Sequence, residues 1–183
     1  MTSSVVLLAG GGIDSTLCMR ILRMQARPFR ALHIDFGQPA AAMEWKSVLD
    51  HATQCGAEAE QIIIRSNLNF EPGEIPGRNA ALIFQAVVTV RPTEHFVQIG
   101  VHAGTPFYDC SPSFIAAMSS IVAECTNASV MLQAPLLRLT KPEIVAMCSN
   151  HGVDFNSVHS CQRAVVGGCG RCHSCLDRRA LAC

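Results

Sequence analysis

The sequence predicts an α/β protein with a doubly wound parallel five-stranded sheet and a C-terminal zinc knuckle. Three observations lead to this fold class. Short β-rich apolar runs alternate with longer helical segments five times, which is typical of a parallel sheet covered by helices on both faces. A run of three glycines follows the first strand, and four cysteines are closely spaced near the end of the chain. In such a sheet, ligands bind at the carboxyl ends of the strands, beside the first strand.

The apolar runs and the capping signals place each element in turn. The predicted strands span residues 5–8, 29–35, 61–64, 95–101 and 130–133. The predicted helices span residues 14–25, 44–55, 79–90 and 112–125, and a last one runs from Thr140 to Gly152. Gly56 suits a C-cap, Asn79 suits an N-cap, and Thr140 with Glu143 matches a capping box.

Length and charge limit the domain organisation and the partners. With 183 residues and 19.7 kDa, the chain fits one domain at residues 1–158 and a zinc-binding tail at residues 159–183 packed on it. The formal net charge is zero, so there is no strong signal for nucleic acid. The hydrophobic fraction of 49% excludes a disordered chain.

The cytoplasm is the predicted compartment. No basic segment precedes the short apolar run at the N-terminus, so no export signal is expected. No apolar stretch approaches the ~20 residues that a membrane span needs. Four scattered cysteines are predicted to be small buried apolar residues, which is the usual state of a free thiol; they are Cys18, Cys55, Cys125 and Cys148.

Four cysteines near the C-terminus have the spacing of a structural zinc site. Cys169, Cys172 and Cys175 form two overlapping Cys-x-x-Cys pairs, and Cys161 lies eight residues before them. Four thiolates complete a tetrahedron around zinc and leave no open position for catalysis. Glycines in the segment allow the left-handed turns that a knuckle needs; they are Gly167, Gly168 and Gly170.

The glycine run suggests an anion site between the first strand and the first helix. Gly10, Gly11 and Gly12 let the backbone approach a ligand closely, and free N–H groups at a helix start favour phosphate. Ser15 and Thr16 follow with hydroxyl groups. The pattern has no Gly-Lys-Ser/Thr ending, so it is not a Walker loop. The alternative is an ordinary tight turn in which Asp14 caps the helix.

Residues 11–15 resemble the loop of the PP-loop ATP pyrophosphatases, which usually reads Ser-Gly-Gly-x-Asp-Ser, with Gly10 in place of the first serine. Within that superfamily the chain resembles the 7-cyano-7-deazaguanine synthases. The matching segments follow the family's order over almost the whole chain; they are residues 36–38, 76–79, 99–103, 109–114, 134–136, 140–145 and 160–163. Pro39 and Ala40 replace the basic pair that is common in this family.

The resemblance implies an adenine nucleotide alpha-hydrolase-like fold and an ATP-dependent ligase. Such an enzyme adenylates a deazaguanine carboxylate and uses ammonia to form an amide and then a nitrile, releasing AMP and pyrophosphate. ATP and Mg²⁺ would act at the loop, with structural zinc in the tail. The partners would be a deazapurine acid and ammonia, and the family often forms homodimers, with residues 79–90 as a possible interface.

The resemblance also implies roles for single residues. Gly10, Gly11, Gly12, Ser15 and Thr16 would bind ATP phosphates, and Phe36 would lie near the adenine. Asp14, Ser15 and Arg78 are the candidate catalytic residues, Asp14 through magnesium. His102, Asp109 and Arg163 would line the substrate pocket, and Lys141 could reach phosphate.

Two alternatives stay open at this stage. The same nucleotide site could adenylate another acceptor, either a tRNA base or a protein, although the neutral charge argues against tRNA. The replacement of serine by Gly10 also allows a catalytically decayed, zinc-stabilised subunit.

Overall fold

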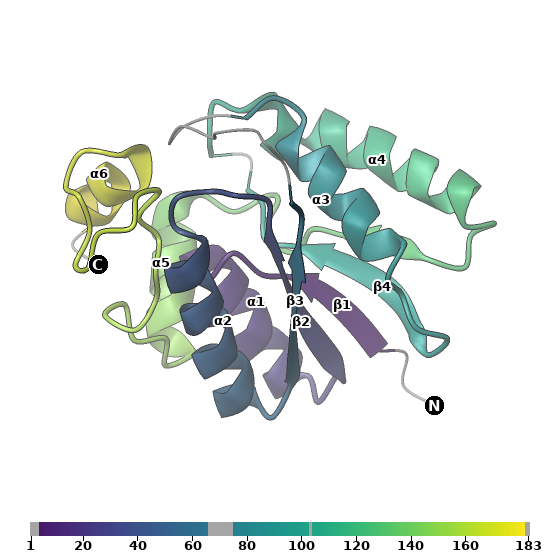
Figure 1. Cartoon of the computed structure of the whole chain (residues 1–183), viewed down its shortest axis with the longest axis horizontal. Helices are drawn as coiled ribbons and strands as arrows, with labels where there is room; N and C mark the ends of the chain where they lie inside the picture. Colours follow the sequence, from purple (N-terminus) through teal and green to yellow (C-terminus); the bar gives the residue numbers. More distant parts are fainter. Residues whose placement is uncertain (1–3, 66–74, 103, 182–183) are drawn as a thin grey trace.

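Five parallel strands form a sheet in the order β3-β2-β1-β4-β5 (Figure 1). The computed structural model describes residues 4–65, 75–102 and 104–181. The strands are β1 (Ser4–Leu8), β2 (Phe29–Asp35), β3 (Glu58–Ile63), β4 (Glu94–Ile99) and β5 (Met131–Gln133). The strand order reverses beside β1, so the carboxyl ends of β1 and β4 frame a crevice of the kind in which α/β proteins bind ligands.

Helices cover both faces of the sheet, which confirms the doubly wound prediction. Figure 1 shows α1 (Ile13–Met24), α2 (Ala41–Cys55) and α5 (Lys141–Asn150) on one side. It shows α3 (Arg78–Val87) and α4 (Pro112–Cys125) on the other. A short 3₁₀ turn, η1 (Tyr108–Cys110), precedes α4, and α6 (His173–Ala180) ends the described chain.

The central strand β1 supplies both hydrophobic cores. Val5 and Leu7 point into the core under α1, α2 and α5, whereas Val6 and Leu8 point into the core under α3 and α4. All four side chains are buried. This alternation is the two-residue period of a strand covered on both faces, and it places the loop after Leu8 between the two helical layers.

The helices appear where the sequence predicts them, with some boundaries shifted: α2 begins at Ala41, three residues early, and α3 ends at Val87, three residues before the predicted end. The capping box of Thr140 and Glu143 is present, and Gly56 ends α2 in the left-handed conformation. Asn79 is not the N-cap of α3, because Gly77 takes that position with φ 75°. The side chain of Asn79 instead donates a hydrogen bond to the backbone oxygen of Asp109 at 3.1 Å.

Other differences have local causes. β3 begins three residues before the predicted position, at Glu58, because an edge strand can hold polar residues with one side open. The helix α6 was not predicted, since no side chain caps its start at Cys172. Part of the predicted loop between β3 and α3, residues 66–74, lies outside the described residues. Cys125 is exposed and Cys55 half-buried, contrary to the prediction, whereas Cys18 and Cys148 are buried.

The apolar helix α3 packs into the core through Ile83, Ala86 and Val87. Its composition is therefore explained by the fold, and homodimerisation remains a prediction. Within the described part of the chain, no helix has the length and apolar character to cross a membrane.

Candidate functional site

The glycine loop makes a sharp turn between β1 and α1 that requires glycine at residue 11. Gly11 has φ +70°, and a Cβ there would lie 2.6 Å from the backbone oxygen of Glu44 on α2. At Gly100, after β4, a Cβ would lie 3.2 Å from the backbone of Asp14. Both glycines let neighbouring backbone segments approach the loop closely, which fixes its position at the end of the sheet.

The loop presents backbone N–H groups that have no protein partner. The amides of Ala9 and Thr16 donate to Leu32 and Gly12, but no described residue accepts a hydrogen bond from the amides of residues 10–15. The first N–H groups of a helix lack intrahelical acceptors, and together with the helix dipole they attract anions. We refer to the amides of residues 10–15 as the amide row.

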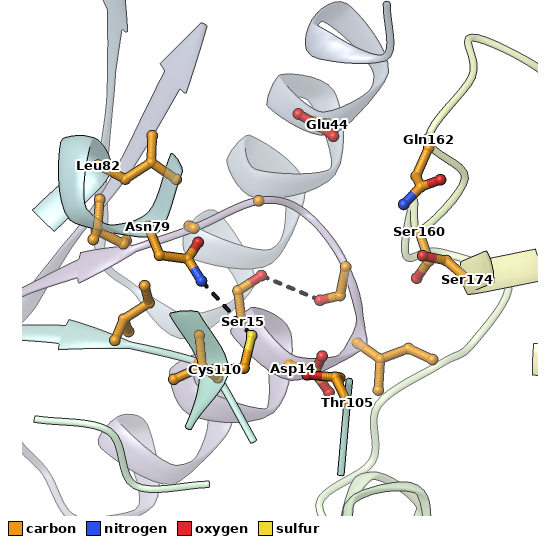
Figure 2. Close-up of a pocket in the computed structure, with 18 of the residues that line it drawn as sticks. Asp14, Ser15, Glu44, Asn79, Leu82, Thr105, Cys110, Ser160, Gln162 and Ser174 are labelled. Atoms are coloured by element: carbon orange, nitrogen blue, oxygen red, sulfur yellow. Dashed lines mark hydrogen bonds between the residues drawn. The ribbon is translucent and has the colours of Figure 1, made fainter. Parts of the chain in front are cut away.

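A cavity of about 340 Å³ opens in front of the amide row. Its floor is formed by the carboxyl ends of β1, β2 and β4, and its volume falls in the range of small-molecule sites. Figure 2 shows Asn79 and Leu82 of α3 on one side of the glycine loop, with Ser160, Gln162 and Ser174 on the other. The cavity is therefore enclosed by both the sheet domain and the C-terminal segment.

Asp14 and Lys141 bring opposite charges to the cavity. The ammonium nitrogen of Lys141 lies 2.6 Å from Oδ1 of Asp14, and both side chains are only partly exposed. Ser15, one residue further along α1, donates from its hydroxyl to the backbone oxygen of Gly12 at 3.2 Å. Lys141 and Asp14 thus place a cation and a carboxylate beside the amide row, where phosphate groups or a divalent ion could bind them.

Buried histidines add polar groups to the cavity wall. Burial lowers the pKa of His102 below its usual value of 6.5, nearby Asp14 partly opposes this, and Lys141 adds to it. The Nδ1 atom of His102 and the Nε2 atom of His33 have no hydrogen-bond partner among the described residues. A buried polar atom without a partner is costly, so both atoms suggest that this cavity takes a polar ligand.

The four C-terminal cysteines converge as the sequence predicted. Their sulfur atoms all lie within 4.8 Å of one another, and those of Cys169 and Cys175 are 4.0 Å apart. Zn–S bonds of about 2.3 Å in a tetrahedron separate the sulfurs by about 3.8 Å, so the four thiols fit a structural zinc ion. Backbone N–H groups of Arg171 and Cys172 lower the pKa of Cys169 to about 6, which favours the thiolate that a metal needs.

The knuckle glycines have the predicted left-handed backbone. Gly167, Gly168 and Gly170 all have positive φ. A Cβ on Gly168 would lie 3.1 Å from the sulfur of Cys175, so a side chain there would press on a metal ligand. Cys172 forms the N-cap of α6 and Cys175 lies in its first turn, so a metal bound here would also anchor α6.

The structure brings together most of the predicted site residues. Those that line the cavity are Gly10, Gly12, Asp14, Ser15, Phe36, Arg78, His102 and Lys141. Four others do not line it. Gly11 is buried behind the loop, with its carbonyl accepting from Ser47 and His159. The Thr16 side chain is fully buried.

The remaining two residues have structural contacts. Asp109 accepts, through Oδ2, a 3.4 Å hydrogen bond from the backbone N–H of Asn79 near the start of α3. The backbone N–H of Arg163 donates to the sulfur of Cys161 at 3.4 Å, which places Arg163 in the knuckle. Substrate binding by Asp109 and Arg163 is a prediction to which this geometry gives no support.

Several cavity residues were not found from the sequence. They are His33, Gln38, Glu44, His159, Ser160, His173 and Asp177. A signal existed for His33, which is a polar residue in an otherwise apolar strand beside the glycine loop. For His173 and Asp177 on α6 no such indication existed in the sequence. These residues reach the cavity only because the preceding cysteine segment folds back toward it.

The comparisons with known proteins agree with this architecture. A family model described as queuosine biosynthesis protein QueC matches residues 69–182. A 7-cyano-7-deazaguanine synthase of Geotalea daltonii is 30% identical, over 97% of this chain and 91% of its own length. One of Geobacter sp. strain M21 is 29% identical, over 97% of this chain and 92% of its own. A predicted tRNA methyltransferase subunit of Methanocaldococcus jannaschii shares the fold, with TM-score 0.54 and 17% identity over 81% of this chain and 76% of that one.

The parallel sheet, the glycine loop at its switch point and the cavity in front of it define a protein of the PP-loop class. The residues before and after the four-thiol cluster line the same cavity. The chain belongs to the QueC family.

Proposed function

We propose that this protein is an ATP-dependent ligase that converts a 7-carboxy-7-deazaguanine-like acid, with ammonia, to the amide and then the nitrile. The observation that carries the proposal is the amide row at the edge of a 340 Å³ cavity, in a chain of the QueC family. The row suits the pyrophosphate part of ATP, and the cavity in front of it has the size of a small-molecule site.

The chemistry needs activation because a carboxylate has no leaving group. A carboxylate oxygen attacks the α-phosphate of ATP, so that a P–O bond forms and the bond to pyrophosphate breaks. Ammonia then attacks the acyl carbon, AMP departs with the bonding electron pair, and a proton is released to water. Adenylation of the amide oxygen repeats the activation, and loss of AMP and protons gives the nitrile. No covalent enzyme intermediate is required, so positioning and charge stabilisation are the main catalytic terms.

The cavity residues divide naturally among these tasks. We assign the pyrophosphate to the amides of Gly10 and Gly12 and to Ser15. Lys141 would neutralise phosphate charge, and Asp14 would hold Mg²⁺, which would supply further neutralisation there. The resemblance places Thr16 with the phosphates as well, but its burial leaves that assignment without support.

The other end of the cavity would bind the adenine of ATP and the deazapurine ring of the substrate. Phe36, at the end of β2, would contact the adenine, and Arg78 at the start of α3 would face phosphate or the substrate carboxylate. His102 would present a neutral ring to the deazapurine, because burial keeps its pKa low. The zinc held by the four cysteines would hold the knuckle and α6 in place.

The test is product analysis with the full chain loaded with zinc. Incubation with ATP, Mg²⁺, ammonia and 7-carboxy-7-deazaguanine should release AMP and pyrophosphate, and mass spectrometry should detect the amide and the nitrile. Omission of the acid should abolish AMP release. Asp14→Asn should reduce the rate at least about tenfold, since the carboxylate that would hold Mg²⁺ beside the phosphates is lost.

Two negative results would separate the alternatives. ATP binding without AMP release from this acid would favour another acceptor, such as a protein. Absence of ATP binding by calorimetry would favour a catalytically decayed subunit, and either result would reject the proposed reaction.

A further inference from the structure

The segment that enters the zinc knuckle docks directly on the glycine loop. The backbone N–H of His159 donates to the carbonyl of Gly11 at 2.9 Å. The hydroxyl of Ser47 on α2 donates to the same carbonyl at 2.7 Å. The His159 N–H holds residue 159 against the back of the loop, and Ser47 ties α2 to the same point. The position of the next residue, Ser160, is therefore set relative to the amide row.

Ser160 carries a buried hydroxyl that no described residue satisfies. Its Oγ lies 3.5 Å from the position that a Cβ on Gly12 would occupy, and Ser160 lines the cavity (Figure 2). A buried hydroxyl without a hydrogen bond is destabilising, and such a group in a folded protein needs an explanation. Its position beside Gly12 suggests that the missing partner is a ligand on the amide row.

The loop itself offers few free hydroxyl groups. Residue 10 is glycine, and a Cβ built there meets nothing within 4 Å, so the space beside the amide row is open at this point. The hydroxyl of Ser15 donates to the carbonyl of Gly12, and Thr16 is fully buried outside the cavity lining. The hydroxyls of Thr16 and Thr105 also lack a partner among the described residues, but Thr16 does not line the cavity. Ser160 lines the cavity, has no described partner, and lies beside Gly12 of the loop.

We propose that Ser160 is a phosphate-binding residue, whose hydroxyl donates to the pyrophosphate part of ATP and supplies the contact that Gly10 cannot make. This rests on the proposed ATP site. Cys161, the next residue, is buried and belongs to the four-thiol cluster. The zinc knuckle thus positions a ligand-binding side chain, and zinc loading and nucleotide affinity are coupled.

The experiment measures binding of Mg²⁺-pyrophosphate and of Mg²⁺-ATP to the zinc-loaded full chain by calorimetry. Ser160→Ala should weaken both about tenfold, the effect of one hydrogen bond to a charged group. Because the hydroxyl has no protein partner, the melting temperature without ligand should be unchanged or higher, and the zinc content should stay the same. Ser149→Ala is the matched control, since its hydroxyl bonds only within α5 and should leave affinity unchanged.

A second variant tests whether the hydroxyl compensates for residue 10. Gly10→Ser places a hydroxyl in the open space, and combined with Ser160→Ala it should restore most of the lost affinity. If Ser160→Ala binds both probes within twofold of the parent protein, the role of Ser160 is rejected while the ATP site stands. If the parent protein binds neither probe, the inference and the proposed function fall together.

Discussion

The ammonium nitrogen of Lys141 lies 2.6 Å from a carboxylate oxygen of Asp14, although 127 residues separate them in the sequence. Lys141 is the first residue of α5, and Asp14 lies in the first turn of α1. The contact therefore joins two helix starts at one corner of the cavity. It gives the glycine loop a cation that the loop motif itself lacks.

Replacement of Lys141 by Met should weaken ATP binding about tenfold, because a charge-assisted contact to phosphate is lost. The zinc content should not change. The matched control is Lys46→Met, where the lysine is exposed on α2 and pairs only with Asp50. Titration calorimetry of both variants provides the measurement. Equal affinities for Lys141→Met and the parent protein would contradict a phosphate role for Lys141.

Alanine at residue 11 should destabilise the protein, whereas alanine at residue 10 should not. Gly11→Ala combines a positive φ with a Cβ only 2.6 Å from the Glu44 oxygen. We expect a loss of about 2 kcal/mol or more in the free energy of unfolding. Gly10→Ala meets nothing within 4 Å and should stay within about 0.5 kcal/mol of the parent protein. Urea denaturation measures both, and similar losses in the two variants would show that the close approach of α2 to residue 11 does not constrain the loop.

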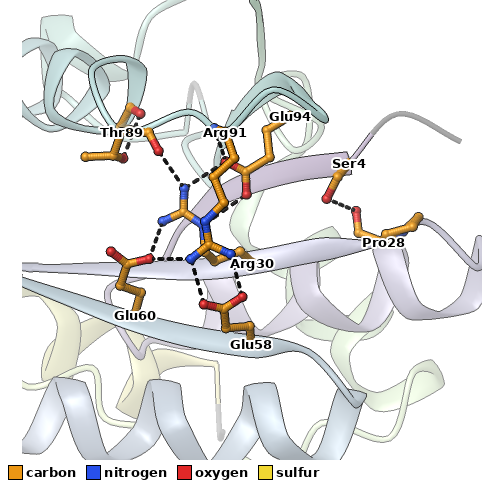
Figure 3. A network of polar contacts seen from close by, with 9 residues as sticks. Ser4, Pro28, Arg30, Glu58, Glu60, Thr89, Arg91 and Glu94 are labelled. Carbon is orange, nitrogen blue, oxygen red and sulfur yellow. Dashed lines mark hydrogen bonds and ion pairs between the residues drawn. The ribbon is translucent and has the colours of Figure 1, made fainter.

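A buried ion pair at the amino ends of the strands should be important for stability (Figure 3). Arg30 on β2 donates to both carboxylate oxygens of Glu94, at 3.0 and 2.9 Å, and the two side chains are 2% and 3% exposed. Glu94→Gln removes the buried carboxylate and leaves Arg30 with Glu60, which is 39% exposed, as its remaining charged partner. The expected cost is about 3 kcal/mol in the free energy of unfolding.

The control for this pair is Glu58→Gln on the same network. Arg91 and Glu58 pair at 2.7 Å but are 46% and 53% exposed, so solvent screens them. Their loss should cost less than about 1 kcal/mol. If Glu94→Gln were no more destabilising than Glu58→Gln in chemical denaturation, the buried pair would not hold the strands as we describe.

Stability should fall as the pH drops below about 6.5, the ordinary histidine pKa. Burial is the main cause that lowers the pKa of both His51 and His102. The unfolded chain therefore binds protons first, and the stability present above the unfolded pKa is lost as the pH falls through the folded pKa. Each histidine contributes a slope of at most about 1.4 kcal/mol per pH unit.

Denaturation at a series of pH values checks this dependence. His102→Asn should reduce the loss of stability between neutral and mildly acidic pH, since one titrating group is removed. His95→Asn replaces an exposed histidine on β4 and serves as control. An unchanged pH profile for His102→Asn would show that its ring titrates alike in the folded and unfolded chain.

Removal of the metal should disorder α6 and open the cavity. Cys172→Ser takes away a buried thiol that is both a member of the four-thiol cluster and the N-cap of α6. We expect loss of bound zinc, faster hydrogen exchange in residues 159–181, and weaker ATP binding. Cys125→Ser, at an exposed thiol outside the cluster, should retain all three properties. Zinc affinity equal to that of the parent protein in Cys172→Ser would contradict the four-cysteine site, since three thiolates bind zinc more weakly than four.

The strand-forming runs, the glycine loop and the cysteine spacing could all be read from the sequence. Each is a local pattern in which neighbouring residues determine the backbone. The start of β3 was predicted wrongly because it depends on contacts with residues far away in the sequence. Glu58 and Glu60 are unusual in a strand, and their place becomes understandable only through Arg30 and Arg91, which come from elsewhere in the chain (Figure 3).

The residues that line the cavity were also hard to predict, because their positions depend on long-range contacts. Ser160 follows no local rule that marks it as a ligand-binding residue, and its significance comes from its distance to Gly12. The carboxylate of Asp109 accepts from Asn79 near the start of α3, a contact that its sequence position did not indicate, and its substrate role stays a prediction.

By itself the sequence determined the fold class, the position of the amide row and the four thiols, because periodicity, glycine content and ligand spacing act over a few residues. Tertiary structure decided which side chains share the cavity. His159 and Ser160 reach it through the docking of residue 159 on Gly11, and the pairing of Lys141 with Asp14 depends on the packing of α5 on α1. Such long-range contacts leave no periodic trace in a single sequence.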